Sequence, residues 1–308
     1  MSGLMLSRRA ATFGGLAALA AFPAAHAAGQ AGRDAPASPP TRIVAMDFGL
    51  AETLIEMGLA PVAIPNPDSW SQWVVEPALP PGVVNLGTDR EPNLELLTAL
   101  KPELIVSTPY LDAIKPLLER FAPTLTFSVY APPVGSAYAR SVVATRALAS
   151  AVGRQVQGEA LIARTEATME EARAALAAAG LAERPVLAVN FLDARHVRVY
   201  GGGSLFGDVM ERVGLINGWT QPSNYWGFNT VGIEALAGSG AGTLLYLEPI
   251  SADTLASLDA SPLWRSLPFV QAGRLVRIPP VLMFGMLPSA MRFAGQLTRH
   301  LAEARPNG

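Results

Sequence analysis

The sequence contains no cysteine and only three histidines among its 308 residues. The absence of cysteine excludes disulfide bonds, thiolate metal sites, a cysteine nucleophile and a lipid-modified cysteine. The HExxH motif, the Walker phosphate loop and the Gly-x-Ser-x-Gly elbow are also absent. We therefore predict a protein that is not an enzyme, has no catalytic residues and no cofactor, and supplies no metal ligands.

The chain also lacks an excess of positive charge. Its 23 basic and 25 acidic residues give a formal net charge of −2. Nucleic-acid binding depends on lysines and arginines that neutralise phosphates. We expect no nucleic-acid partner.

The N-terminus has the pattern of an export signal. Ser7-Arg8-Arg9 precedes an uncharged stretch rich in alanine and leucine, and Ala25-His26-Ala27 is a small-x-small cleavage motif. A membrane anchor is the alternative, but two glycines and a proline interrupt the stretch, which is shorter than the roughly 20 apolar residues of a span. We predict a signal peptide over 1–27, cleaved near Ala27, a disordered leader over 28–40, and a periplasmic protein. The paired arginines suggest the twin-arginine route.

Alternating apolar runs and helical patterns begin after this leader. Arg42–Met46 predicts a strand, Glu52–Met57 a helix that Gly58 ends, and Val62–Ile64 a second strand. The pattern continues with a helix at Leu94–Leu97, a strand at Leu104–Val106, a helix at 113–121 and a strand at Thr124–Phe127. Such alternation favours a mainly parallel sheet. We predict an α/β lobe over 41–136.

The segment 137–182 has a different composition, rich in alanine with interspersed charges. It predicts two consecutive helices, at 139–151 and 156–179, and the second is longer than an average globular helix. Because apolar heptads are not sustained, a coiled coil is less favoured than a rigid spacer.

The α/β pattern then restarts. Strands are expected at Val186–Val189, Val197–Tyr200, Thr243–Leu247 and Arg274–Ile278, with helices at Leu205–Val213, Ile233–Ala237 and Ser289–Ala304. We predict a second lobe over 183–308. The fold class is thus α/β, with two Rossmann-like lobes bridged by a long α-helix and a ligand cleft between them.

Polar candidates for chemistry have ordinary structural interpretations. Asp47 and Glu52 are interpreted as charges at a helix N-terminus. The segment Gly201–Ser204 could bind an anion, but a turn with Ser204 as the N-cap is favoured. Asp193–His196 is interpreted as a turn between strands.

Aromatic residues are more informative. Trp70 and Trp73 lie in a polar, proline-flanked segment, and Tyr225-Trp226 lies in another. Either they cap the ends of their lobes, or they line a cleft for a bulky, partly apolar ligand.

Arg90 is a candidate polar anchor. It lies just before a predicted helix, and its guanidinium offers several donors to a pair of ligand oxygens. A salt bridge with Asp89 or Glu91 is the alternative.

Several motifs together resemble the periplasmic ferric-hydroxamate-binding proteins of Gram-negative bacteria, in the long-helix class of receptors for ABC importers. The motifs are Trp73–Pro77, Glu91–Leu97 with Lys101-Pro102, Asp193–His196, Asn224–Gly227, Pro262–Trp264 and Leu267–Arg274. The resemblance covers about Thr41 to Ala302. It implies a monomeric receptor that holds an iron(III)-hydroxamate siderophore between its lobes and delivers it to an inner-membrane ABC permease with its ATPase. The chelator would hold the iron, so the protein would need no metal ligand.

The resemblance also implies site residues. Those expected at the ligand are Trp73, Arg90, Tyr110, Asn224, Trp226, Leu282 and Phe284. In an ungapped alignment the family's arginine falls on Asp89, one position before Arg90. Leu282 and Phe284 stand where the family has a tryptophan and a tyrosine.

For docking to the permease, the family uses one acidic residue on each lobe. Glu234 matches the position in the second lobe. Lys115 and Pro116 occupy the position in the first lobe, so Asp112 or Glu119 would substitute, and we predict Asp112 as the docking residue. A haem or cobalamin receptor of the same architecture is the second hypothesis, with Tyr110 as an axial haem ligand. A periplasmic enzyme is the third.

Overall fold

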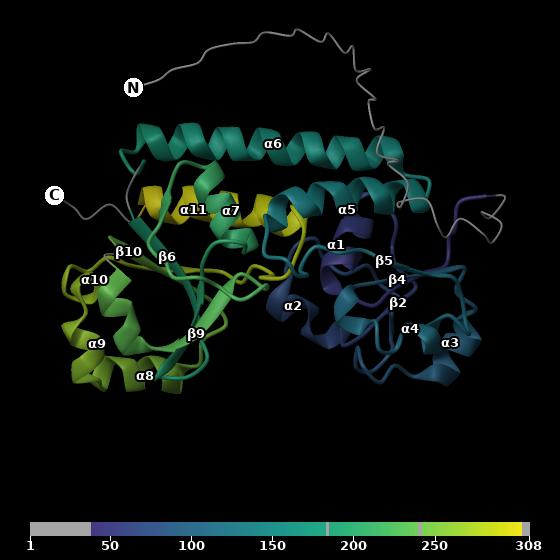
Figure 1. Cartoon of the computed structure of the whole chain (residues 1–308), viewed down its shortest axis with the longest axis horizontal. Coiled ribbons are helices and arrows are strands. Elements are labelled where there is room, and N and C mark those ends of the chain that lie inside the picture. Colours follow the sequence, from purple (N-terminus) through teal and green to yellow (C-terminus); the bar gives the residue numbers. More distant parts are fainter. Residues whose placement is uncertain (1–37, 183–184, 240–241, 304–308) are drawn as a thin grey trace, which may run out of the picture. The chain divides into compact units, whose positions relative to one another are not determined.

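The computed structural model describes residues 38–182, 185–239 and 242–303. The predicted signal peptide and residues 28–37 of the predicted leader lie outside these ranges. Two β-sheets and their covering helices form the fold (Figure 1). Within the described residues, no helix is both long enough and apolar enough to cross a membrane.

The first sheet is entirely parallel. Its strands are β1 (Ile43–Ala45), β2 (Ala63–Ile64), β3 (Val84–Asn85), β4 (Leu104–Ser107) and β5 (Thr124–Thr126), in the order β3-β2-β1-β4-β5. Ile43 and Ala45 pack into one hydrophobic cluster, whereas Val44 packs into a second cluster on the opposite face. Because both faces are buried at the centre of the sheet, β1 and β4 are largely apolar runs, as the sequence predicted.

Short helices cover this sheet. They are α1 (Phe48–Glu56), α2 (Trp70–Trp73), α3 (Leu94–Leu100) and α4 (Lys115–Leu118), with 3-10 turns η1 (Pro67–Ser69) and η2 (Pro109–Leu111). The helix predicted over 113–121 is wrong in extent, because only α4 is helical. Pro116 lies in its first turn, where proline lacks the N–H that a longer upstream helix would need.

Two longer helices follow, α5 (Ala137–Ala151) and α6 (Gln155–Ala178), which confirms the predicted pair. Arg164 of α6 forms an ion pair with Glu56 of α1 at 2.8 Å. Glu166 of α6 pairs with Arg212, beyond the first sheet in sequence, at 3.3 Å. The long helix therefore contacts both halves of the fold, as predicted for a bridge (Figure 1).

The second sheet is mixed. Its strands are β6 (Pro185–Phe191), β7 (His196–Tyr200), β8 (Ile216–Asn217), β9 (Phe228–Gly232), β10 (Thr243–Leu247) and β11 (Leu275–Ile278). The order is β11-β10-β6-β7-β9, and β8 pairs with β6. β7 runs antiparallel to β6 and β9. The edge of the second sheet formed by β7 and β9 is therefore antiparallel, whereas β6, β8, β10 and β11 pair in parallel. The predicted turn between β6 and β7 is confirmed, and a connection this short can join only antiparallel neighbours.

The remaining helices are α7 (Leu205–Arg212), α8 (Ala252–Ala260), α9 (Pro262–Ser266), α10 (Pro268–Gln271) and α11 (Leu287–Glu303), with a 3-10 helix η3 (Ile233–Ser239). Ser204 caps α7 by accepting a hydrogen bond from Gly207 N at 2.9 Å, as predicted. The short helix predicted near Ile233 is present as the 3-10 helix η3. The architecture is the predicted one, with two α/β lobes and a bridging helix.

Candidate functional site

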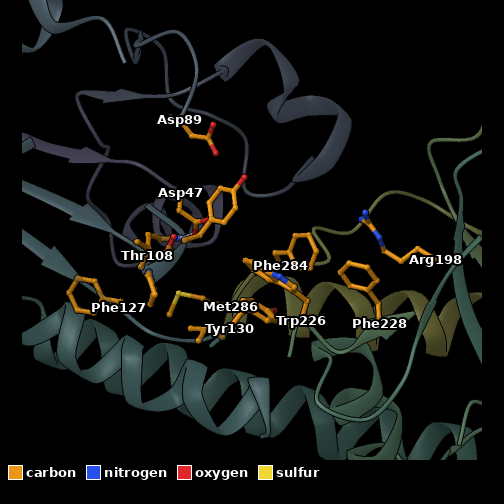
Figure 2. Close-up of a pocket in the computed structure, with 14 residues that line it drawn as sticks. Asp47, Asp89, Thr108, Phe127, Tyr130, Arg198, Trp226, Phe228, Phe284 and Met286 are labelled. Atoms are coloured by element: carbon orange, nitrogen blue, oxygen red, sulfur yellow. Dashed lines mark hydrogen bonds between the residues drawn. The ribbon is translucent and has the colours of Figure 1, made fainter. Parts of the chain in front are cut away.

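A cavity of about 390 Å³ lies where the ends of the two sheets meet. It is lined by Asp47, Leu50, Asp89, Thr108, Pro109, Tyr110, Phe127, Val129, Tyr130, Arg198, Trp226, Phe228, Phe284 and Met286 (Figure 2). Asp47 follows β1, Thr108–Tyr110 follows β4 and Phe127–Tyr130 follows β5. The carboxyl ends of parallel strands are where open α/β sheets bind ligands.

Aromatic rings from both lobes make up much of the cavity wall. The ring centroid of Trp226 lies 5.8 Å from that of Tyr110, 6.0 Å from that of Tyr130 and 5.1 Å from that of Phe284. The Tyr225 ring centroid lies 5.0 Å from that of Trp226, and Tyr225 is 40% exposed. Such a surface suits a bulky ligand with apolar arms.

Tyr130 fixes the position of the loop that brings Phe284 to the cavity. Its hydroxyl donates a hydrogen bond to the Gly285 carbonyl at 2.9 Å. Burial raises the pKa of Tyr130 well above its usual value, and the charges of Asp47 and Glu52 add to the effect. Tyr130 is therefore a neutral hydroxyl that holds the two lobes together at the cavity.

Two carboxyl groups belong to the cavity. Asp47 Oδ1 accepts a hydrogen bond from Leu50 N at 3.0 Å, so it caps α1 as the sequence predicted. Burial raises the pKa of Asp47 to about 6, and the nearby charge of Asp89 contributes in the same direction. Asp89 Oδ1 accepts a hydrogen bond from Arg90 N at 2.9 Å.

Glu52 corrects the sequence interpretation. It is not a charge at a helix terminus, because its side chain is completely buried behind the cavity. It accepts hydrogen bonds from Met286 N at 2.9 Å and from Ser289 Oγ at 2.8 Å. Burial raises the pKa of Glu52 to about 8, and the hydrogen bonds only partly offset this effect.

Arg90 lies on Tyr110 and not in an ion pair. Its Cζ is 4.5 Å from the centroid of the Tyr110 ring, and none of the ion pairs of the described residues includes it. Asp89 stabilises the loop instead, because its carboxylate accepts a hydrogen bond from the backbone N–H of Arg90. The one-residue shift thus places Asp89 in the cavity wall and Arg90 beside it, at an exposed position.

The structure brings three of the expected ligand residues into the cavity wall, namely Tyr110, Trp226 and Phe284. Trp73 is half-buried against the core, and Leu282 lies within the core with 9% exposure. Asn224 lies behind Trp226, where its Oδ1 accepts a hydrogen bond from Trp226 N at 2.9 Å.

For Trp70 the structure contradicts the cleft alternative, because the residue belongs to the core of the first lobe. Its ring is buried, packs edge-on against Phe48 at 5.3 Å and donates from Nε1 to the Pro77 carbonyl at 2.8 Å. The fully satisfied indole is a core residue of the first lobe.

Both expected docking acids are exposed. Asp112 follows η2 at the carboxyl-end edge of the first sheet. Glu234 lies in the first turn of η3, and its carboxylate folds back over Gly232, where a Cβ atom would collide with it. Glycine at position 232 therefore allows this side-chain conformation.

Arg198 and Tyr130 are cavity residues that the sequence analysis missed. In β7, Val197 and Val199 belong to the core on one face, whereas Arg198 and Tyr200 share the other. Period-two alternation alone would have placed Arg198 on the same side as a buried tyrosine. The described residues contain no group of three or more histidine, aspartate or glutamate side chains that could hold a metal ion.

A cavity at the carboxyl ends of one parallel sheet, completed by loops of a second lobe, defines a two-lobed ligand-binding protein. Residues 43–282 match the sequence model of the periplasmic binding protein family, and the chain belongs to this family.

Individual relatives narrow the comparison. The chain is 33% identical over 254 residues to the iron(3+)-hydroxamate-binding protein FhuD of Escherichia coli strain K12, which covers 82% of this chain and 84% of that protein. It is 27% identical over 192 residues to the achromobactin-binding periplasmic protein of Dickeya dadantii, covering 60% and 58% of the two chains. The crystal structure of Vibrio cholerae FhuD with Fe³⁺-Desferal matches with a TM-score of 0.81 at 30% identity, covering 86% of this chain and 99% of that one.

Proposed function

We propose that this protein is a periplasmic receptor that binds an iron(III)-hydroxamate siderophore and delivers it to an inner-membrane ABC permease with its ATPase. The observation that carries the proposal is the aromatic cavity formed by Tyr110, Tyr130, Trp226 and Phe284. The similarity to two FhuD proteins supports the ligand class. The siderophore itself would coordinate the iron, and the protein would bind the complex without catalysing a reaction.

Within this proposal, the residues have distinct roles. Tyr110 and Arg90 donate hydrogen bonds to hydroxamate oxygens, and the rings of Trp226 and Phe284 pack against the siderophore arms. Asn224 positions Trp226 through the hydrogen bond from its backbone N–H. Trp73 and Leu282 support the cavity from the core and do not contact the ligand.

Two acids are proposed to dock the permease. Asp112 and Glu234 are exposed and belong to different lobes. Carboxylates of this kind would pair with permease arginines and set the orientation of the complex. Replacing either with alanine should lower siderophore uptake while leaving ligand affinity unchanged. Uptake equal to that of the wild type in both variants would contradict the docking role.

The location and the domain boundaries are also proposals. We infer export to the periplasm as a monomer, by a signal peptide over 1–27 and the twin-arginine route. The names of relatives such as the achromobactin-binding periplasmic protein support the location. We propose lobes over 41–136 and 183–308 joined by the helical connector 137–182.

A fluorescence titration tests the function. Ferric ferrichrome, ferric desferrioxamine, haem and cobalamin are each added to the mature protein, and quenching of tryptophan emission is followed. Saturable quenching by the hydroxamates alone is expected, because Trp226 lies in the cavity wall. Saturation by haem or cobalamin alone would replace the siderophore assignment, and no response to any of them would reopen the enzyme hypothesis.

A further inference from the structure

Arg198 carries a positive charge at the cavity and forms no ion pair with a carboxylate of the described residues. Its side chain lines the cavity. Its Nη1 donates to Met283 Sδ at 2.9 Å, and sulfur is a weak acceptor. Its Nε is buried and has no hydrogen-bond partner. The guanidinium therefore retains donor capacity that the protein does not use.

The arginine is nevertheless held in place. β7 lies between β6 and β9, where Arg198 is in register with Asn190 and Thr230. The guanidinium carbon lies 4.4 Å from the Phe228 ring centroid and 5.7 Å from that of Phe284. Stacking on aromatic rings orients a guanidinium without consuming its N–H groups. A donor group ordered before binding loses less entropy when the ligand arrives.

The charged residues of the cavity are divided between the lobes, with the acids in one lobe and the arginine in the other. Asp47 and Asp89 belong to the first lobe, whereas Arg198 belongs to the second. In Figure 2 Arg198 lies on the right next to Phe228, whereas Asp47 and Asp89 lie to the left of the Phe284 ring. A ligand with an apolar middle and an anionic group at one end matches this arrangement.

The energetics favour a binding role over a structural one. A partly buried cation without an anionic partner costs folding free energy, and an apolar side chain of similar length would avoid that cost. The fork of N–H donors matches the two oxygens of a carboxylate. A bound carboxylate would use the donors that the protein leaves free.

We propose that Arg198 determines specificity by selecting ferric hydroxamates that carry a free carboxylate. The inference rests on the proposed siderophore function and refines its ligand class. The iron centre would contact the Tyr110 side of the cavity, and the carboxylate would extend across the aromatic rings to β7.

A matched series of ligands tests this. Ferric desferrioxamine is used with its terminal amine free, acetylated or succinylated, so that the iron centre is constant and the terminus is cationic, neutral or anionic. Affinities are measured by calorimetry for the wild type, Arg198→Met and Arg198→Lys. Arg195→Met is the control, because it removes an exposed positive charge from the turn before β7.

The wild type and the Arg195→Met variant should bind the succinylated complex most tightly. Arg198→Met should weaken binding of the succinylated complex by about tenfold or more relative to the acetylated one. Arg198→Lys keeps the charge but loses the fork, so it should retain part of the preference. If Arg198→Met does not fold, as judged by circular dichroism, the wild type and Arg198→Lys still decide the question by their ligand preference.

The other outcomes are equally informative. Equal losses for all three complexes would overturn the proposal by assigning Arg198 to the iron-centre oxygens, and unchanged affinities would also overturn it. Both results leave the siderophore function intact. Failure of the wild type to bind any of the three complexes would instead contradict the proposed function itself.

Discussion

Ser289 Oγ lies 2.8 Å from both carboxyl oxygens of Glu52. The contact joins α1 of the first lobe to the first turn of α11, and Glu52 also accepts from Met286 N at 2.9 Å. Gly285 lies so close to the same two side chains that a Cβ atom there would collide with them. A buried carboxyl group from one lobe thus fixes the segment of the other lobe that carries Phe284 into the cavity.

This carboxyl group predicts how stability depends on pH. The pKa of Glu52 rises from an ordinary 4.5 to about 8 on folding, so the folded state binds the proton more tightly than the unfolded state. The stabilisation is complete below about pH 4.5 and is lost as the pH rises toward about 8. We expect the free energy of unfolding to fall by about 2 to 5 kcal/mol across this window. Urea unfolding at several pH values measures it.

Glu52→Gln supplies the decisive comparison, since glutamine preserves the shape of the protonated side chain. The variant should lose most of the pH dependence between about pH 6 and 8. A smaller dependence should remain below about pH 6, because the pKa of Asp47 is also raised by burial. The control Glu95→Gln changes an exposed residue of α3 and should retain the full slope. If the free energy of unfolding of Glu52→Gln depends on pH as steeply as that of the wild type, Glu52 is not the group responsible.

Trp226 should be both the main reporter of binding and a major contributor to affinity. Its indole contacts the rings of Tyr110 and Tyr130 from the first lobe and of Phe284 from the second lobe. Trp226→Ala is expected to weaken ferric hydroxamate binding by about 2 kcal/mol or more and to remove most of the quenching. Trp264→Phe is the control, because Trp264 is buried in the separate core of the second lobe. Equal quenching in Trp226→Ala and the wild type would place the ligand elsewhere.

Arg90 and Tyr110 should act as a coupled pair. Arg90→Ala is expected to weaken hydroxamate binding by about 1.5 to 3 kcal/mol, through loss of a charge-assisted hydrogen bond. A double-mutant cycle with Tyr110→Leu should give a coupling free energy of about 0.5 to 1 kcal/mol, because the guanidinium lies on the ring. Arg120→Ala removes an exposed charge of the same lobe and should leave affinity unchanged. If Arg90→Ala binds the ferric hydroxamate as tightly as the wild type, Arg90 does not contact the ligand and contributes only to the structure of its loop.

The fold could be predicted because its elements depend on local patterns. The apolar run at Ile43–Ala45 predicts strand β1 from its own residues, and the alanine-rich segment predicts helices α5 and α6 in the same way. The short strand β9 could not be predicted, because only its pairing with β7 makes it a strand. Sequence resemblance likewise singled out Trp226 and Phe284, which the structure places in the cavity wall.

The polar part of the site was harder to predict. Glu52 resembles an ordinary helix charge until the chain brings Ser289, 237 residues away, against it. Arg198 occurs in an unremarkable strand, and its role depends on rings supplied by Phe228 and Phe284. Burial and charge environment are properties of tertiary contact, so a single sequence contains no direct record of them.

Leu282 and Phe284 lie two residues apart, and the structure predicts opposite effects for their replacement. Leu282 is part of the core, so Leu282→Ala should lower the free energy of unfolding by about 2 to 4 kcal/mol with little effect on affinity. Phe284 lines the cavity and contacts Trp226 and Tyr130, with ring centroids at 5.1 and 5.6 Å. Phe284→Ala should therefore weaken ligand binding by about 1 to 3 kcal/mol. Chemical denaturation and fluorescence titration of both variants separate the two effects, and a large loss of affinity in folded Leu282→Ala would return that residue to the ligand site.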